Sequence, residues 1–560
     1  MEQKLQDAVR EALIKMGTSD VLFAIEWPAD LAHGDFATNA ALAAAKTLGR
    51  SPLDIAEELV LKLKESLGDE IEKIEAAGPG FVNITLTHAA IAKTLTYAAR
   101  DDSWGTGNAN TGRSVMIEYS NPNPFKEIHI GHLMSNVIGE ALSRVLEASG
   151  ARVIRDTFGG DVGPHVAKTL WAIKKKGMTD LASASEIGGA YTHGSNAYEE
   201  NPEAKAEIDL LNTQIYDIVA KQDTPETLTE EERSILALWR KGREVSMEEF
   251  ARIFAILGTR FDYIFYDSDT TKGGMSVVRD GIERGVFEES DGAVIYRGEK
   301  KGLHTLVFIT SRGTPTYETK DIGLAFLKEE RHPTDEVVII TAIEQIGHFE
   351  VVLAALEEIA PLLAKKTKHV PHGLLRLTTG KMASRKGNII TASDLLKDMV
   401  SAASEKNADP LVAEQVAVAA IKYMILRQAP GGDIIFDPEK SLSLEGDSGP
   451  YLQYALVRAK SVIAQSDVAA DASDMPEEIY DLERLVIRFP EVARRAEAAR
   501  APHLIAQYLT QLAGEWNSFY AQNRIRGGEH EAYKLTLADA FVATMERGLD
   551  LLGIPVPEKM

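Results

Sequence analysis

Two histidines stand three residues apart in the segment Asn121–His132, which reads NPNPFKEIHIGH. The pattern predicts a strand over residues 114–120 and a helix over residues 131–149, so the segment lies at a strand-to-helix junction. Unpaired N–H groups at a helix start attract phosphate, and His129 and His132 would share one face there. The spacing therefore indicates imidazoles that hydrogen-bond to a triphosphate and to the charge that develops on it.

Two neighbours of these histidines favour the same interpretation. Gly131 has no Cβ, so a flat base can lie against the backbone at that position, and Lys126 adds a positive charge nearby. On position alone, a helix start with two solvent-facing histidines is an alternative of equal weight, because short motifs match by chance.

A second candidate is the basic segment Gly380–Asn388, which reads GKMASRKGN. Lys381, Arg385 and Lys386 place three cations between glycines, a composition that suits a loop closing over polyphosphate. Taken alone, a solvated basic turn is the more common explanation of such a run.

The elements around the first segment predict a parallel sheet. The strand at 114–120, the helix at 131–149 and a second strand at 152–158 form a β-α-β unit of the doubly wound, Rossmann-like kind. Residues from about 165 to 260 read as a charged helical insertion, and strand patterns return at 293–296, 304–309 and 336–341.

The rest of the chain suggests further domains, as expected for 560 residues. Helical patterns at 5–16 and 52–67 and a strand that follows Gly-Pro-Gly at 78–80 predict an N-terminal α+β domain over residues 1–95. We expect the α/β domain at 110–395, connecting helices at 396–440 and an all-α C-terminal domain at 441–560.

Composition excludes several classes of protein. With 61 basic and 84 acidic side chains the net charge is −23, which argues against general coating of DNA or RNA but allows binding of one folded RNA. The absence of cysteine excludes disulfides and thiol nucleophiles, and we expect no metal site. No window approaches the roughly 20 apolar residues of a membrane span, so we expect a cytoplasmic protein without membrane contact.

The two candidate segments together resemble the signatures of class I aminoacyl-tRNA synthetases. HIGH at 129–132 matches letter for letter, whereas KMASR at 381–385 departs from KMSKS at its last three positions. Further stretches resemble the arginine–tRNA ligase family in particular, in the order of that family. They are 31–39 (LAHGDFATN), 77–83 (AGPGFVN), 445–454 (EGDSGPYLQY), 488–491 (RFPE), 516–520 (WNSFY) and 551–560 (LLGIPVPEKM).

The resemblance implies roles for matching residues. Catalytic roles fall on His129, His132, Lys126 and Lys381, and ATP binding on Gly131, Met382, Ser384, Arg385 and Lys386. Arginine binding falls on Glu118, Asn123, Tyr317, Asp321 and Gln345, and tRNA contact on Phe81 and Asn83. Independently of the resemblance, a planar guanidinium is bound by carboxylates, and Glu118 and Asp321 are candidates. The alternatives are a surface carboxylate for Glu118 and core packing for Tyr317 and Phe81; His165 would only line the site, and His33 and His348 read as structural.

The implied reaction uses ATP and Mg²⁺ to form arginyl-adenylate and pyrophosphate, after which the tRNA for arginine takes the acyl group and AMP leaves. The N-terminal domain would contact the tRNA elbow and the C-terminal domain the anticodon, and in this family arginine activation commonly needs bound tRNA. We expect a monomer. Three rivals stay open: a synthetase or nucleotidyltransferase for another substrate, a non-catalytic RNA-binding relative, and a plain nucleotide-binding scaffold.

Overall fold

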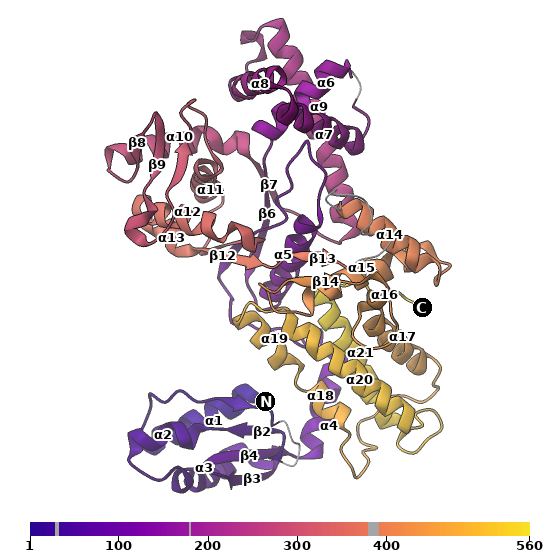
Figure 1. Ribbon diagram of the computed structural model, residues 1–560. Coiled ribbons are helices and arrows are strands. Elements are labelled where there is room, and N and C mark those ends of the chain that lie inside the picture. The colour runs from indigo at the N-terminus through magenta and orange to yellow at the C-terminus, as the bar shows by residue number, and fades with distance from the viewer. Residues whose placement is uncertain (29–32, 179–180, 379–390) are drawn as a thin grey trace. The chain divides into compact units, whose positions relative to one another are not determined.

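The computed structural model of the chain describes residues 1–28, 33–178, 181–378 and 391–560, which form two compact units (Figure 1). Unit 1 comprises Met1–Gly105, Tyr454–Arg495 and Tyr508–Gly548. Unit 2 comprises Thr106–Gln453, Ala496–Gln507 and Leu549–Met560. No helix in the described ranges is long and apolar enough to cross a membrane.

The N-terminal part of unit 1 is built on a four-stranded antiparallel sheet of order β1-β2-β4-β3. Its strands are β1 (Ile25–Glu26), β2 (Phe36–Thr38), β3 (Ile71–Ala77) and β4 (Phe81–Leu86), and its helices are α1 (Glu2–Lys15), α2 (Ala40–Leu48), α3 (Pro52–Leu67) and α4 (His88–Arg100). Helices α2 and α3 pack on β3 and β4. The helices at 5–16 and 52–67 and the strand after Gly-Pro-Gly are confirmed.

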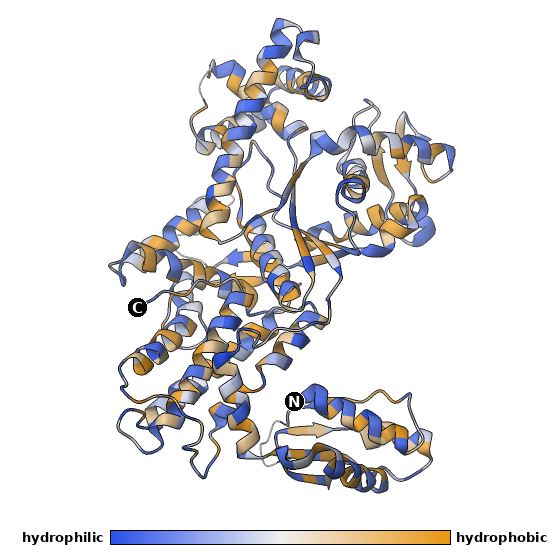
Figure 2. Cartoon of the chain, turned by 180° about the vertical axis from the view of Figure 1, so that it is seen from behind, coloured by the Kyte–Doolittle hydropathy of each residue, from blue (hydrophilic) through white to orange (hydrophobic). Residues whose placement is uncertain are grey.

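Unit 2 is organised by a five-stranded parallel sheet of order β12-β11-β5-β6-β7. The strands are β5 (Ser114–Glu118), β6 (Arg152–Gly159), β7 (Tyr263–Tyr266), β11 (Glu336–Ala342) and β12 (Thr367–His372). The crossover helix α5 (Ile130–Ala148) joins β5 to β6, which confirms the predicted β-α-β unit. The middle residues of β5 and β11 are hydrophobic and largely buried, as expected where helices cover a parallel sheet, whereas β6 also carries charged residues (Figure 2 shows both kinds of segment).

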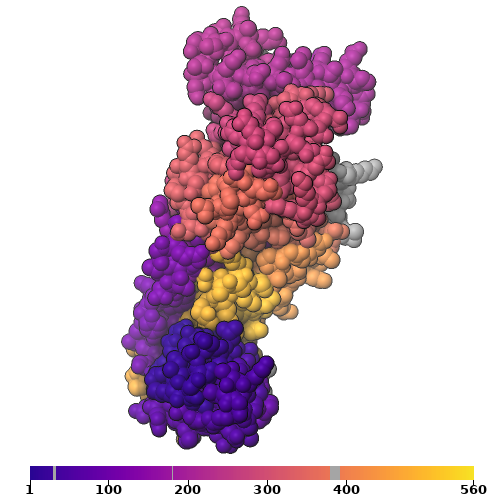
Figure 3. Space-filling view, turned by 90° about the vertical axis from the view of Figure 1, so that its left-hand side faces the viewer, coloured from indigo at the N-terminus to yellow at the C-terminus, as the bar shows by residue number. Residues whose placement is uncertain are grey.

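The predicted helical insertion is a bundle of four helices between β6 and β7. Its members are α6 (Pro164–Lys176), α7 (Ala184–Glu200), α8 (Pro202–Ala220) and α9 (Glu230–Ile256). Apolar side chains at helical spacing make its core, and Trp239 lies fully buried in it. In Figure 3 the magenta residues of this bundle form a lobe of their own within unit 2.

The remaining elements of unit 2 complete the surroundings of the sheet. Between β7 and β12 lie α10 (Asp267–Glu283), α11 (Tyr317–Arg331), α12 (Ile346–Ile359) and α13 (Pro361–Lys366). The strands β8 (Glu288–Ser290), β9 (Ala293–Tyr296) and β10 (Leu306–Ile309) form a separate antiparallel sheet.

The described chain from residue 391 onwards is nearly all helical, as predicted. The helices are α14 (Ala392–Ser404), α15 (Pro410–Leu426), α16 (Pro438–Ser441), α17 (Gly449–Ala464), α18 (Asp481–Val486), α19 (Phe489–Ala498), α20 (His503–Gln522) and α21 (Glu531–Leu551). One element was not predicted: β14 (Ile434–Phe436) pairs in parallel with β13 (Leu375–Leu377). A three-residue strand whose partner lies far along the chain leaves no periodicity to detect.

Candidate active site

The carboxyl end of β5 carries an unusual concentration of backbone strain. Ser120, Asn121 and Phe125 have positive φ angles of 72°, 50° and 68°, which side chains other than glycine rarely adopt. Asn121 stabilises the bend because its Oδ1 accepts from the Phe158 N–H at 2.9 Å. Such strain persists where surrounding contacts determine the backbone, and it marks this junction as a functional site.

The two histidines of the first segment cap α5 together. The Gly131 N–H donates to His129 Nδ1 at 3.1 Å, and the His129 N–H donates to His132 Nδ1 at 3.3 Å. Their rings stack with centroids 3.7 Å apart. Burial, and after it the charge of Lys126, lowers the pKa of His129; burial, His129 and Lys126 lower that of His132 well below its usual value. Because each neutral ring accepts at Nδ1, its proton lies on Nε2, from which it can donate.

The described chain that follows the second signature contacts this histidine segment. Lys381, Met382, Ser384, Arg385 and Lys386 lie outside the described residues. The first described residue after them that is bonded to the histidine segment is Thr391, which forms an isolated bridge with His129, and the next N–H, that of Ala392, donates to Ile128 O at 2.7 Å. The chain after the segment is therefore attached beside the histidines.

Glu118 ends β5 and belongs to a buried charge cluster. Lys328 of α11 places its Nζ 2.6 Å from Glu118 Oε2 and 2.6 Å from Asp156 Oδ2. Asn121 Nδ2 donates to the other Glu118 oxygen at 2.7 Å. Burial raises the pKa of Asp156 to about 7, against the attraction of Lys328. The alternative of a surface carboxylate for Glu118 is wrong, since the residue is only 1% exposed.

Asp321 lies on the first turns of α11 and is paired with a histidine. His348 Nε2 is 2.5 Å from Asp321 Oδ2, and its Nδ1 is 3.4 Å from Glu318 Oε1. Burial by itself lowers the pKa of His348, but the bonds to Asp321 and Glu318 raise it to about 10. His348 is therefore an imidazolium at neutral pH that holds a predicted arginine-binding carboxylate, which is more than its structural interpretation implied.

Asp267 lies at the same edge of the sheet and is a candidate site residue that was not predicted from the sequence. It begins α10 at the carboxyl end of β7, and Lys320 Nζ lies 2.6 Å from its Oδ2. A Cβ on Gly160 would meet Asn123 Oδ1 at 2.5 Å and Asp267 Oδ2 at 3.2 Å, so these two side chains flank the same glycine. Burial raises the pKa of Asp267 to about 6, against the attraction of Lys320. The signal available in the sequence was an acid directly after a strand of the parallel sheet.

The other predicted residues have more varied settings. Tyr317 begins α11 and is 56% exposed, which contradicts the core-packing alternative, and its ring centroid lies 5.1 Å from Lys320 Nζ. Gln345 ends an exposed turn after β11. His165 is buried, with Nε2 2.7 Å from Gly160 O.

The two predicted tRNA contacts lie in β4 of unit 1. Phe81 is 37% exposed, so the core alternative for it is also wrong. Asn83 is only 7% exposed and pairs in register between Ala37 and Glu75, which leaves little of it accessible to a base.

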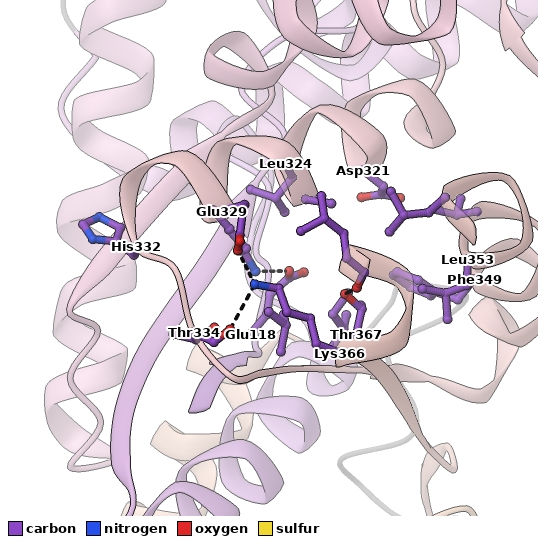
Figure 4. A pocket seen from close by; sticks show the side chains of 17 residues that line it. Glu118, Asp321, Leu324, Glu329, His332, Thr334, Phe349, Leu353, Lys366 and Thr367 are labelled. Atoms are coloured by element: carbon purple, nitrogen blue, oxygen red, sulfur yellow. Dashed lines mark hydrogen bonds and ion pairs between the residues drawn. The ribbon is translucent and has the colours of Figure 1, made fainter. Parts of the chain in front are cut away.

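A small apolar cavity that is partly open to solvent lies beneath α11. Its lining includes Leu324, Val337, Ile339, Phe349, Val352 and Leu356. Glu118, Lys328 and Asp321 border the same space (Figure 4). The charged groups therefore have an apolar wall on one side, and charges interact more strongly where water is excluded.

Comparison with known proteins covers nearly the whole chain. The family described as tRNA synthetases class I (R), catalytic domain, matches residues 96–437, the arginyl tRNA synthetase N terminal domain matches 3–86, and the DALR anticodon binding domain matches 452–560. The chain is 30% identical over 518 residues to the arginine–tRNA ligase of Bacteroides thetaiotaomicron, covering 86% of each protein.

Other relatives give the same result. The arginine–tRNA ligase of Treponema denticola is 29% identical over 552 residues, covering 92% of this chain and 91% of that one. The structure of the arginyl-tRNA synthetase of Thermus thermophilus superposes with a TM-score of 0.79 at 26% identity, over 100% of both chains. The HIGH motif at the strand-to-helix junction and the acids at the same sheet edge agree with these matches. The chain belongs to the arginyl-tRNA synthetase family, the class I enzymes that use ATP to attach arginine to its tRNA.

Proposed function

We propose that the acids at the carboxyl edge of the parallel sheet bind the two cationic ends of L-arginine. In the described part of this edge, five carboxylates in three ion-paired groups face three cations. The carboxylates are Glu118, Asp156, Asp267, Glu318 and Asp321, and the cations are Lys320, Lys328 and the imidazolium of His348. Asp156, whose pKa burial raises to about 7, is partly protonated at neutral pH, and the edge still holds more negative than positive charge, which suits the guanidinium and the α-ammonium group of arginine. This imbalance is the observation that carries the proposal.

The guanidinium is best suited by Asp321 and Asp267. Both carboxylates keep lone pairs beyond those used by His348 and Lys320. A guanidinium offers five N–H donors in a planar fork, so it can bridge two carboxylates. The exposed Tyr317 would add its hydroxyl, while Asn123 and Gln345 would orient the amino-acid end.

Glu118 has a different role in the binding of arginine. Lys328 and Asn121 already occupy one lone pair on each of its oxygens. We assign it to the electrostatic field that attracts the ammonium of arginine, with its orientation fixed by those two donors.

On the ATP side, His129 and His132 would donate from Nε2–H to the phosphates. A neutral imidazole donor adds no charge of its own, which suits a site where Lys126 and the 381–386 segment supply the cations. Such donors stabilise a reaction most when they face the oxygens whose charge grows during the attack. A Cβ on Gly131 would lie 2.9 Å from the His129 ring, so the glycine makes room for that imidazole at the first turn of α5, beside which the base of ATP would lie.

The proposed chemistry has two steps. The α-carboxylate of arginine attacks the α-phosphorus of ATP, the bond to the β-phosphate bridging oxygen breaks, and pyrophosphate leaves. The terminal ribose hydroxyl of the tRNA then attacks the acyl carbon, and AMP leaves. Mg²⁺ would enter as part of the ATP substrate.

Several finer assignments belong to the same proposal. Met382, Ser384, Arg385 and Lys386 would contact ATP together with Lys381, and Phe81 would stack on a tRNA base, with Asn83 beside it. We propose that the enzyme acts as a monomer in the cytoplasm, where its tRNA is charged.

The test is ATP–pyrophosphate exchange with purified protein and arginine, with and without the tRNA for arginine. Exchange with arginine but not with lysine or citrulline is the expected result, and a requirement for tRNA is expected from the family. Exchange with another amino acid and none with arginine would contradict the assignment of these acids.

A further inference from the structure

The helical insertion holds the segment in front of the histidines at three successive residues, beginning with Phe125. The Phe125 side chain is fully buried in the apolar core of α6–α9. Its N–H donates to Ser246 Oγ of α9 at 3.0 Å. Gly242, one turn earlier on α9, makes room for the ring, because a Cβ there would lie 2.3 Å from it. The left-handed backbone of Phe125 is thus stabilised by the bundle.

The next two residues contact α7. The Nζ of Lys126 lies 4.8 Å from the centroid of the Tyr191 ring. The Glu127 side chain lies against Gly188, where a Cβ would come within 3.0 Å of its carboxyl carbon. Gly188 and Tyr191 are three residues apart and therefore share a face of α7, and that face is the one that meets the histidine segment.

The Lys126 ammonium lies among the groups that would surround a triphosphate. After burial, its charge is the next cause that lowers the pKa of His129 and of His165, and it contributes in the same direction at His132. A lysine side chain has four rotatable bonds and a point charge, so it needs an external contact to keep one position. An aromatic face attracts the ammonium without neutralising it, whereas a carboxylate would cancel the charge that phosphate requires.

We propose that Tyr191 is a positioning residue for Lys126, and that the helical insertion thereby takes part in ATP binding. The insertion is then more than a tRNA-contacting or structural addition, because one of its helices fixes a phosphate-binding cation. This inference rests on the proposed role of Lys126 in binding ATP.

The experiment is a double-mutant cycle measured by ATP–pyrophosphate exchange at saturating arginine and tRNA. The variants are Tyr191→Leu, Tyr191→Phe, Lys126→Met and the combination of Tyr191→Leu with Lys126→Met. Tyr198→Leu is the matched control, because its ring on the same helix faces other lysines, with Lys168 Nζ 4.4 Å and Lys205 Nζ 5.1 Å from the centroid. Thermal unfolding checks each fold, and Tyr191→Gln replaces Tyr191→Leu in the cycle if the latter does not fold.

Loss of the ring in Tyr191→Leu should raise the KM for ATP about three- to tenfold, while Tyr191→Phe, which keeps an aromatic face, stays close to the unchanged protein. In the Lys126→Met background the same substitution should have less than about a twofold further effect. Tyr198→Leu should leave the KM for ATP unchanged.

The outcomes separate this inference from the proposed function. Equal effects of Tyr191→Leu with and without Lys126, or an equal effect of Tyr198→Leu, would overturn the inference alone. If Lys126→Met itself leaves the KM for ATP unchanged, the proposed role of Lys126 fails, and the positioning role of Tyr191 fails with it.

Discussion

Replacing Lys328 by methionine should destabilise unit 2 in a way that depends on pH. Its Nζ lies 2.6 Å from both Glu118 Oε2 and Asp156 Oδ2, and all three side chains are at most 4% exposed. Methionine fills similar volume but leaves two carboxylates buried without their cation. Breaking a buried pair in this manner costs about 3–5 kcal/mol.

The pH dependence follows from Asp156. In the unchanged protein burial raises the pKa of its carboxyl to about 7, so at pH 5 that carboxyl is protonated and Lys328→Met removes the cation chiefly from Glu118. At pH 8 the Asp156 carboxyl is ionised in the unchanged protein, and the variant must either hold two buried carboxylates without a cation or take up a proton that the unfolded chain, whose carboxyl has its usual pKa of 3.8, has released. The loss of stability relative to the unchanged protein is therefore larger at pH 8 than at pH 5.

The measurement is calorimetric unfolding of the full chain at pH 5 and pH 8, since a chain of two units need not unfold in one step. For a unit of this size, about 4 kcal/mol corresponds to a fall in Tm of roughly 5 °C. Adding Asp156→Asn removes one of the two buried carboxylates that lack a cation. The double variant should therefore regain most of the loss at pH 8 and lose the pH dependence.

Two results would refute the reasoning on Lys328. One is an equal loss of Tm at pH 5 and pH 8, which would mean that the loss of stability comes from lost packing and not from buried carboxylates without a cation. The other is a double variant no more stable than Lys328→Met, which would mean that Asp156 is not the carboxylate left without a partner.

Three other predictions follow from single contacts. Asp321→Asn should lower kcat/KM for arginine about tenfold to a hundredfold with little change in the KM for ATP, since a charged hydrogen bond to the substrate is lost; an equal effect on both substrates would contradict this. The pKa of His348 rises from 6.5 to about 10 on folding, so its contribution is complete below pH 6.5 and is lost as pH rises through 10. The Tm advantage of the unchanged protein over His348→Gln should shrink over that window, and a constant difference would argue against an imidazolium. Gly139→Ala should cost about 1–3 kcal/mol, because the new Cβ would lie 2.2 Å from the Tyr119 ring, whereas Gly189→Ala, with nothing within 4 Å of its Cβ, should be neutral or stabilising in the same thermal assay.

The local elements of the site could be predicted from the sequence because each has a local signal. The strand at 114–120 and the helix at 131–149 follow from apolar periodicity, and the structure has β5 at Ser114–Glu118 and α5 at Ile130–Ala148. The strand ends two residues early because Ser120 and Asn121 adopt left-handed conformations. Those conformations depend on bonds to residues distant in the chain, such as the one from the Phe158 N–H to Asn121.

The charge pairs of the site could not be predicted in this way. Lys328 and Glu118 are 210 residues apart, and Lys320 and Asp267 are 53 apart. Each looks like an ordinary helix or strand-end charge in the sequence, where charged residues are most often solvated. Only the parallel order of the sheet, which places β5 between β11 and β6, brings α11 over the end of β5 and buries Lys328.

The imbalance of charge at this edge has a consequence for substrate choice. Asp267 and Asp321 each have one protein cation, from Lys320 and His348, and lone pairs left over for a planar fork. A neutral analogue such as citrulline would leave both facing an uncharged group in a partly buried site, and a site built around such groups rejects a substrate that cannot pair them. Lysine has the charge but a single ammonium, which cannot donate to two carboxylates in parallel pairs. The protein can therefore discriminate between amino acids when they bind. The helical insertion is not needed for that discrimination and can contribute to ATP binding through Tyr191.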